Sequence, residues 1–205
     1  MLKDWGRCLL FFLVLTVLTG LIYPLLVTGL AQLAFPHKAN GSLETKDGKV
    51  IGSYLIGQEF TSPYYFHGRP SASDYDAMDS GGPNYAPSSR SLAEEVEKRY
   101  HALTKENPGL TRQQTPLDLI TTSASGLDPH ISPEAALIQV PRIARARSVP
   151  EEALVKLVKK YTRPRWLGIY GEPRVNVLEL NLALDRYFGS PTAGVNRNQV
   201  QVHRP

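Results

Sequence analysis

The chain has 205 residues, of which 42% are apolar, and a formal net charge of +4 at pH 7. This length suits one ordinary domain with an appendage, and the mild charge without a basic stripe argues against a nucleic-acid partner. Cys8 is the one cysteine, which excludes a disulfide framework and any site built on several thiolates of this chain.

Residues 9–35 form an uncharged apolar run, LLFFLVLTVLTGLIYPLLVTGLAQLAF. About 20 helical residues cross the hydrocarbon core of a bilayer, and only a helix satisfies its own backbone groups there. We therefore predict a transmembrane helix over residues 9–34, after a short cytoplasmic head at residues 1–8. A cleaved signal peptide is the alternative, but its apolar region usually spans only about 7–15 residues.

Basic residues flank both ends of this run, so the positive-inside comparison is nearly balanced. Lys3 and Arg7 precede it, whereas Lys38, Lys46 and Lys49 follow it. A short basic head before a long apolar run is typical of a signal anchor. We expect the N-terminus in the cytoplasm and the following domain outside.

The predicted membrane helix also contains several small residues, Thr16, Gly20, Thr28 and Gly29. Small residues let membrane helices approach each other closely, and Thr16 and Gly20 stand four apart, as in small-xxx-small pairs. The pattern favours packing on a partner helix, with ordinary variation in composition as the alternative.

Over residues 35–189 the sequence predicts one soluble domain of mixed α and β structure with few strands. Over residues 190–205 it predicts a flexible polar tail. KVIGSYLI at residues 49–56 is rich in β-branched and aromatic residues and predicts a strand. Residues 57–89 lack helical periodicity but carry many aromatic rings, which disordered linkers lack. We expect a long ordered loop held by these rings. The fold class is α+β.

Four helices are expected in the second half of the chain. Ser91 and Glu94 have the spacing of a capping box, and Ser132-Pro133 begins a second helix that Pro141 must kink or split. Residues 148–151 open a third helix. The fourth is capped by Asn176 and ends at Gly189.

The stretch TTSASGLDPHISP at residues 121–133 brings two serines, an aspartate and a histidine together in sequence. A serine nucleophile needs a base within hydrogen-bonding reach and a group that orients the base. No G-x-S-x-G elbow is present, while Ser-Gly, Asp-Pro and Ser-Pro are ordinary turn and helix-entry pairs. The stretch therefore predicts a structural turn, with a hydrolase triad or a partner-binding loop as the alternatives.

No metal site, catalytic residue or resident cofactor is predicted from the residues. Asp74, Asp76 and Asp79 fail the calcium-loop pattern, because Met78 and Tyr85 occupy ligand positions. No glycine-rich phosphate loop is present. A small basic cluster, Arg142, Arg145 and Arg147, is interpreted as a solvated helix face, with an acidic partner as the alternative.

Six phrases distributed along the chain nevertheless resemble a known family, the C subunits of bacterial Kdp potassium-transporting ATPases. The resemblance extends from the membrane segment to Asp185. The phrases are LIGQEF at 55–60, YFHGRPSA at 65–72, SGGPNYAPS at 80–88, TTSASGLDPHISPEAA at 121–136, QVPRIARAR at 139–147 and GEPRVNVLELNLALD at 171–185.

The resemblance implies a non-catalytic accessory subunit of a high-affinity potassium uptake complex in the bacterial inner membrane. Its implied partners are a channel-like K⁺-translocating subunit, a P-type ATPase subunit, a small single-helix subunit and membrane lipid. The complex uses ATP, Mg²⁺ and K⁺, but the chain lacks the D-K-T-G-T phosphorylation motif and any T-V-G-Y-G-like filter. Two roles are implied: a catalytic chaperone that raises the ATPase subunit's affinity for ATP, or a domain over the ion entrance.

We favour the second role, because no phosphate cradle is visible. The candidate partner interface consists of the loops at residues 58–89 and 123–132, in particular Arg69, Asn84, Ser125, Asp128 and His130. Two alternatives are a membrane-anchored serine hydrolase that uses Ser123 or Ser125 with His130, and a stand-alone anchored binding protein.

Overall fold

The structure is a computed structural model that describes residues 2–46 and 48–191. The chain divides into two compact units, Met1–Leu43 and Glu44–Pro205. The first unit is helical and the second contains both helices and two small sheets. The expected α+β class with one N-terminal apolar helix is therefore confirmed, whereas the predicted tail lies mostly outside the described residues.

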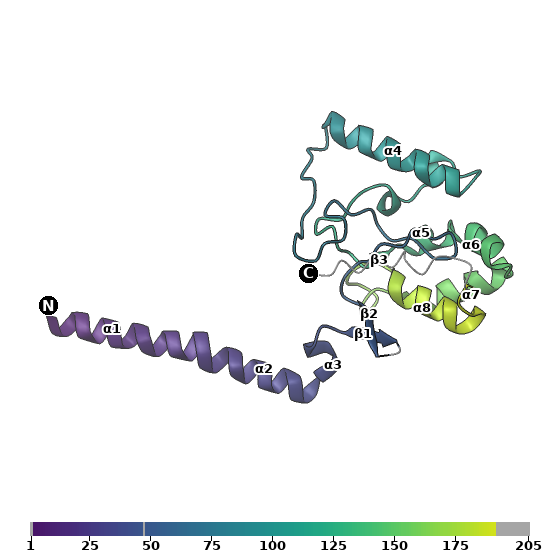
Figure 1. Ribbon diagram of the computed structural model, residues 1–205. Coiled ribbons are helices and arrows are strands. Elements are labelled where there is room, and N and C mark those ends of the chain that lie inside the picture. The colour runs from purple at the N-terminus through teal and green to yellow at the C-terminus, as the bar shows by residue number, and fades with distance from the viewer. Residues whose placement is uncertain (1, 47, 192–205) are drawn as a thin grey trace. The chain divides into compact units, whose positions relative to one another are not determined.

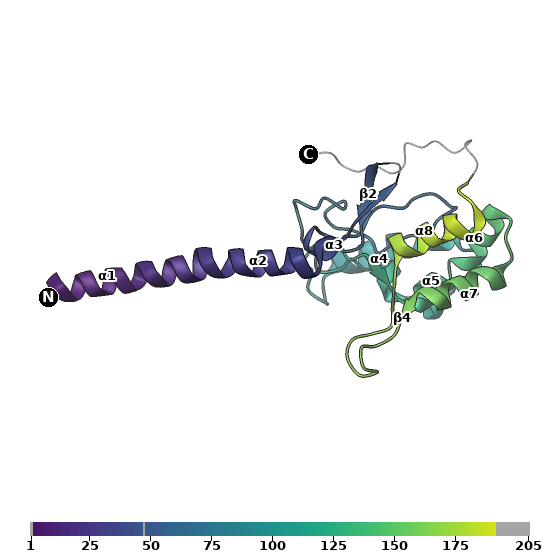
Figure 2. The ribbon, with the colours of Figure 1, turned by 90° about the horizontal axis from the view of Figure 1, so that it is seen from below.

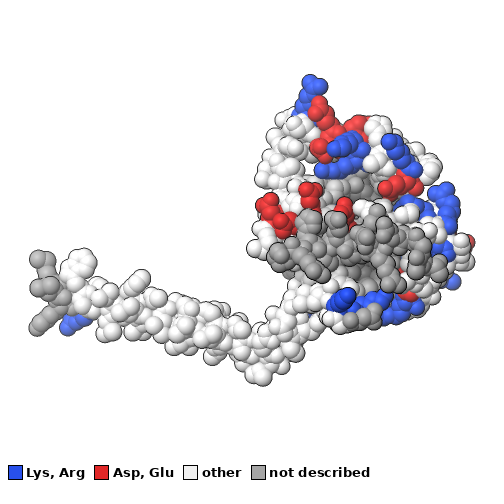
Figure 3. Space-filling view, viewed as in Figure 1, with Lys and Arg blue, Asp and Glu red and all other residues white. Residues whose placement is uncertain are grey.

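The first unit consists of α1 (Leu2–Val17), a π-helical turn at Leu18–Ile22, α2 (Tyr23–Ala34) and the short α3 (Pro36–Ala39). The 31 helical residues Asp4–Ala34 are long and apolar enough to cross a membrane. At 1.5 Å per residue they extend over about 46 Å. Figure 3 shows this helix as an almost uncharged surface, with basic atoms only near its beginning.

Pro24 explains the π-helical turn within this helix. Proline has no amide hydrogen and crowds the carbonyl four residues earlier, which here belongs to Gly20. The chain widens before it, so that the Tyr23 amide donates to the carbonyl of Leu18, five residues back. Such single π turns relieve a local conflict without ending the helix.

The soluble unit contains two small antiparallel sheets and five α-helices among its described residues. β1 (Leu43–Lys46) pairs with β2 (Lys49–Ser53), and β5 (Arg174–Asn176) lies between β3 (His130–Ile131) and β4 (Thr162–Arg163). His130 is opposite Asn176, and Thr162 is opposite Val175. The helices are α4 (Arg90–Glu106), α5 (Pro133–Leu137), α6 (Val140–Arg147), α7 (Glu151–Tyr161) and α8 (Val177–Phe188), with 3₁₀ turns at Arg112–Gln114 and Leu117–Leu119.

The hydrophobic core lies among α5, α6, α7, α8 and β5. Figure 1 shows the four helices grouped together. Leu154 of α7, Leu180 and Leu184 of α8 and Val175 of β5 are completely buried. Phe66, from the long loop, is also 0% exposed and joins the same cluster. The prediction that aromatic rings hold this loop in place is thus confirmed at Phe66.

Several predicted boundaries differ from the structure. The strand expected at 49–56 ends at Ser53. The Ser91–Glu94 capping box is wrong, because the N-cap of α4 lies two residues earlier, at Ser89, which makes no side-chain cap bond. The third helix begins at Glu151, and Ser148 instead ends α6 in a left-handed conformation.

Two other helix predictions are confirmed. The helix expected after Ser132 is split into α5 and α6, with Pro141 in the first turn of α6. Asn176 accepts a hydrogen bond from the Glu179 amide as the cap of α8, which ends at Gly189.

Candidate functional site

The candidate site is a surface formed by two loops, residues 57–82 and 121–131, which we call the loop platform. The Gly57 amide donates to the Leu127 carbonyl (2.7 Å), and the Ser80 hydroxyl donates to the Ser125 carbonyl (3.1 Å). The two loops are distant in sequence, so these bonds join them into one surface.

Glycine permits the closest approaches within the loop platform. A Cβ atom on Gly57 would lie 2.8 Å from the carbonyl oxygen of Asp128, and one on Gly126 would lie 2.7 Å from the Ser73 hydroxyl. Gly126 also has a φ of +69°, a conformation that glycine adopts without a steric penalty. Side chains at these positions would force the two loops apart.

Arg69 and Asp128 form the central polar contact of the loop platform. Arg69 donates from one terminal nitrogen to Asp128 Oδ2 and from the other to the Thr122 carbonyl, both at 3.2 Å. The Tyr75 hydroxyl donates to the Arg69 carbonyl (2.6 Å). Burial raises the pKa of Tyr75 to about 12, so this donor keeps its proton at physiological pH.

Asp128 also organises the following turn. Its Oδ1 accepts a hydrogen bond from the His130 amide (3.0 Å) and lies 3.4 Å from Nδ1 of the His130 ring. Burial by itself raises the pKa of Asp128, but the bonds from His130 and the charge of Arg69 outweigh it. The pKa of Asp128 is therefore below its usual value, which favours an ionised carboxylate in the turn.

Two buried amide side chains clamp the backbone of residues 66 and 67. Asn181 of α8 accepts from the Phe66 amide (2.8 Å) and donates to the Phe66 carbonyl (2.9 Å). Gln139 makes the equivalent pair with His67, at 2.8 and 3.2 Å. A carboxamide carries both a donor and an acceptor, so each side chain satisfies both backbone groups of one loop residue.

Arginine side chains complete this clamp. Arg142, 6% exposed, donates to the carbonyls of Pro63 (2.9 Å) and Tyr65 (3.0 Å). Arg147 donates to the Tyr64 carbonyl (2.7 Å). The interpretation of these two arginines as a solvated face is wrong, because their charges hold the loop carbonyls inside the domain. Arg145 is exposed, as that interpretation required.

The predicted interface residues are placed as follows. Arg69, Asp128 and His130 lie together, and Ser125 is in the same turn, where its exposed hydroxyl accepts from the Leu127 amide (3.1 Å). Asn84 is exposed with a φ of +52°, and within the described chain no hydrogen bond joins it to the others. Its identity as an interface residue stays a prediction.

The serine and histidine side chains of the turn do not form the constellation of a hydrolase. The hydroxyls of Ser123 and Ser125 lie 3.4 Å apart, while the His130 ring faces Asp128. Across residues 121–133, all of which are described, no hydrogen bond links either hydroxyl to the histidine. The arrangement is that of the structural turn that the sequence predicts.

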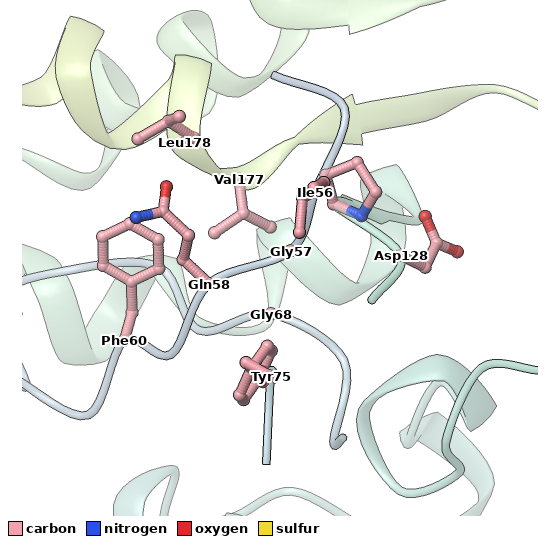
Figure 4. A pocket seen from close by; sticks show the side chains of 10 residues that line it. Ile56, Gly57, Gln58, Phe60, Gly68, Tyr75, Asp128, Val177 and Leu178 are labelled. Atoms are coloured by element: carbon pink, nitrogen blue, oxygen red, sulfur yellow. The ribbon is translucent and has the colours of Figure 1, made fainter. Parts of the chain in front are cut away.

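A cavity of about 10 Å³ lies beside the loop platform (Figure 4). Its walls include Gly57, Gly68, Tyr75, Asp128 and Val177. This volume is about that needed for one water molecule. A larger groove of about 330 Å³, between the end of α4 and α6, is lined by residues such as Leu110, Ile138 and Arg145.

The membrane-helix residues lie in the first unit. Thr16 donates to the Phe12 carbonyl (2.8 Å), so its hydroxyl is bonded within the helix. Cβ atoms at Gly20 and Gly29 would meet nothing within 4 Å, and Thr28 is exposed. The helix therefore presents small, accessible surfaces at these positions.

Comparison with known proteins identifies the family of this chain. The family model described as "K+-transporting ATPase, c chain" matches residues 5–186. The chain belongs to the KdpC family. It is 55% identical over 182 residues to the potassium-transporting ATPase KdpC subunit of Caldanaerobacter subterraneus subsp. tengcongensis, an alignment that covers 89% of this chain and 94% of the relative.

Further KdpC subunits are similarly close. The relative from Bradyrhizobium diazoefficiens is 53% identical, with 91% of this chain and 98% of the relative covered. The relative from Methylobacterium nodulans is also 53% identical, over 92% of this chain and all of the relative. The resemblance found in the sequence is thereby confirmed. As a KdpC, the chain is a subunit of a K⁺-transporting ATPase and associates with other subunits of that complex.

Proposed function

We propose that this chain is a non-catalytic accessory subunit whose soluble domain lies outside the cytoplasm, over the ion entrance of a channel-like subunit. The K⁺ path, ATP and Mg²⁺ then belong to the partner subunits. The observation that carries the proposal is the Arg69–Asp128 contact, which joins two loops of distant sequence into one fixed polar surface.

A docking surface is most effective when it is already in its bound conformation, because less conformational entropy is lost on association. The loop platform fits this requirement. Its backbone is tied to helices through Gln139, Asn181 and Arg142, and the two loops are tied together at Gly57. These bonds support a role in assembly rather than in chemistry.

The competing role, a catalytic chaperone that touches ATP, needs a phosphate-binding arrangement of backbone amides or cations. The cavity beside Asp128 accommodates only about one water. In the larger groove, Arg145 is the cationic lining residue and its Nε donates to the Pro141 carbonyl. Neither site favours a triphosphate, so we place the domain on the side of the membrane that lacks ATP.

Topology mapping tests this placement directly. A reporter that is active only outside the cytoplasm, fused after Pro205, should be active, and a cytoplasmic reporter at the same point should not. The opposite result would reject the entrance role and favour the chaperone.

Docking through the loop platform is tested with exposed residues, because Arg69 and Asp128 also stabilise the fold. Ser125→Arg within the loop platform and Asn84→Arg, two residues beyond its first loop, add bulk and charge at exposed positions. We expect each variant to co-purify with less of the partner subunits while its near-UV circular dichroism shows that the fold is retained. Ser91→Arg, an equivalent change on α4, is the matched control. Equal recovery of partners with all three variants would show that docking occurs elsewhere.

The membrane helix supplies a second contact in this proposal. Gly20→Leu fills the accessible surface beside Thr16 and should reduce co-purification of the other membrane subunits. Leu18→Phe adds bulk two residues earlier, on the opposite side of the helix. Loss of partners with both variants alike would indicate general disruption of the helix instead of a specific packing face.

A further inference from the structure

A hairpin between β4 and β5 carries four large apolar side chains into solvent. Trp166, Leu167, Ile169 and Tyr170, which we call the aromatic tip, are 68%, 72%, 74% and 63% exposed. Trp166 and Tyr170 pair across the hairpin, with backbone hydrogen bonds of 2.8 and 3.0 Å and ring centroids 5.8 Å apart. The tip is therefore ordered by its own contacts and not by the core.

Three residues, 167–169, connect the paired Trp166 and Tyr170, and the Ile169 amide closes a tight turn on the Trp166 carbonyl (3.1 Å). Leu167 and Gly168 both have positive φ, at +51° and +75°. A type I′ turn needs this conformation at both central positions and usually has Asn, Asp or Gly there. A leucine at the first position accepts backbone strain and presents an apolar side chain at the extremity. Figure 2 shows the segment that follows β4 extending away from α7 and α8.

Polarity changes in order along the hairpin. The aliphatic Leu167 and Ile169 flank the turn, and the amphipathic rings of Trp166 and Tyr170 follow. Next comes the Arg165–Glu172 ion pair (2.6 Å), and at the base Arg163 pairs with Glu179 of α8 (2.6 Å). A bilayer surface shows the same order, from hydrocarbon through the interfacial layer that Trp and Tyr prefer to charged headgroups.

The charge of the hairpin complements an anionic lipid surface. Residues 162–174 contain three arginines, at 163, 165 and 174, against one acidic residue, Glu172. Arg163 and Arg165 are paired with Glu179 and Glu172, whereas Arg174 is exposed and has no ion pair within the described chain. Guanidinium groups bind phosphate in a two-pronged geometry, and anionic leaflets attract basic segments close to the membrane. A protein pocket would not by itself explain why the arginines lie behind the aromatic rings on both strands.

The short connection between the two units also limits how far the aromatic tip can lie from a bilayer. Residues 35–43 separate the end of the membrane-length helix from the soluble unit. Nine extended residues would cover about 32 Å, and the connection is shorter than this because Pro36–Ala39 is helical. A second attachment on the same chain benefits from high effective concentration. A segment that binds a membrane too weakly to hold a free protein there can therefore insert when the chain is already anchored.

We propose that the aromatic tip inserts into the boundary between headgroups and hydrocarbon, as a second attachment of the soluble unit to the membrane. Anionic phospholipid is the ligand, attracted by the net positive charge of the hairpin and bound by the exposed Arg174 behind the tip. The insertion needs only a membrane-anchored chain, so it does not depend on which side of the membrane the domain faces.

The chain has two tryptophans, Trp5 and Trp166, which permits a direct test. In full-length Trp5→Phe protein reconstituted into vesicles containing phosphatidylglycerol, Trp166 is the sole tryptophan. Because an inserted ring lies at acyl-chain depth, brominated acyl chains should reduce its emission about twofold, and aqueous acrylamide should quench it weakly. Vesicles of phosphatidylcholine alone should give less bromine quenching.

The matched variant adds Leu167→Asp and Ile169→Asp to Trp5→Phe. These side chains are exposed, so unfolding should be unchanged while bromine quenching is lost and acrylamide quenching rises. If Trp166 of the parent is quenched fully by acrylamide and not by brominated lipid, the proposal is wrong. It is also wrong if Trp166 is protected only after the other pump subunits are added, because the tip would then dock on protein.

Discussion

Arg147 at the end of α6 and Asp185 in α8 form a 2.7 Å ion pair in which the arginine side chain is only 4% exposed. The same guanidinium donates to the carbonyls of Tyr64 (2.7 Å) and Gly189 (2.8 Å), and it lies 4.8 Å from the centre of the Tyr65 ring. One side chain thus joins the long loop, α6 and the end of α8.

Truncation of this arginine should be costly. Arg147→Ala leaves Asp185 mostly buried without its ionic partner, and loss of one partner of such a pair costs about 3 kcal/mol or more. We expect this loss in the free energy of unfolding of the full chain in detergent, measured by urea titration and near-UV circular dichroism. Arg145→Ala, an exposed change on the same helix, should alter it by less than about 0.5 kcal/mol. Equal effects would contradict the structural role of Arg147.

The turn at Asp128 should lose stability in acid. Burial alone would raise the pKa of Asp128, but His130 and Arg69 lower it below its unfolded value. The unfolded chain therefore binds the proton more readily. The contribution of Asp128 to the free energy of unfolding is complete above the ordinary aspartate pKa of about 4. It is lost as the pH falls through the lower pKa of the folded state.

Asp128→Asn should accordingly flatten the dependence of the urea midpoint on pH in this acidic range. Asp79→Asn, which changes an exposed carboxylate of the neighbouring loop, is the control and should leave the slope nearly intact. An unchanged slope in Asp128→Asn would mean that the ion pair with Arg69 does not form in solution.

The cap of α8 provides a third test. Asn176 is buried, its Oδ1 accepts from the Glu179 amide (3.0 Å) and its amide donates to the Tyr54 carbonyl (2.8 Å). Asn176→Ala should lower the unfolding free energy by about 2 kcal/mol, since it removes a cap and leaves buried groups unpaired.

Ser89→Ala is the matched control at the N-cap position of α4, where the serine makes no capping bond. Its effect on thermal unfolding should be small. A similar loss in both variants would show that residue type, and not the observed bond, determines the cost.

The close approach of the two loops can be probed by one methyl group. Gly57→Ala places a Cβ atom 2.8 Å from the Asp128 carbonyl oxygen, so the loops must separate, at about 1–3 kcal/mol. Gly81→Ala adds the same group where nothing lies within 4 Å. Thermal unfolding should distinguish the two variants, and a tolerated Gly57→Ala would refute tight packing of the loop platform.

Local patterns in the sequence were sufficient for the helices with strong signals. Asn176 and Gly189 bracket α8 because a cap and a terminating glycine act within one turn of the chain. Pro141 divides α5 from α6 for an equally local reason. The strands β3, β4 and β5, of two or three residues each, were missed because no alternating pattern can develop over that length.

The arginine clamp was not predictable from composition. Arg142 and Arg147 resemble surface residues until the carbonyls of residues 63–65 are brought against them by tertiary folding. Two of the candidate interface residues, Arg69 and Asp128, are 59 positions apart in sequence and in contact in space, while their role in an interface stays a prediction. Only the family resemblance linked their two segments beforehand.

The π-helical turn at Leu18–Ile22 has a consequence for the face of the membrane helix. A turn closed by a bond to the fifth preceding residue contains one more residue than an α-turn, so everything after it is rotated by about 100°. In an unbroken α-helix, Thr28 would point well away from Thr16 and Gly20. With the extra residue, these three positions lie on one face of the helix, where a neighbouring helix would contact small side chains along its length.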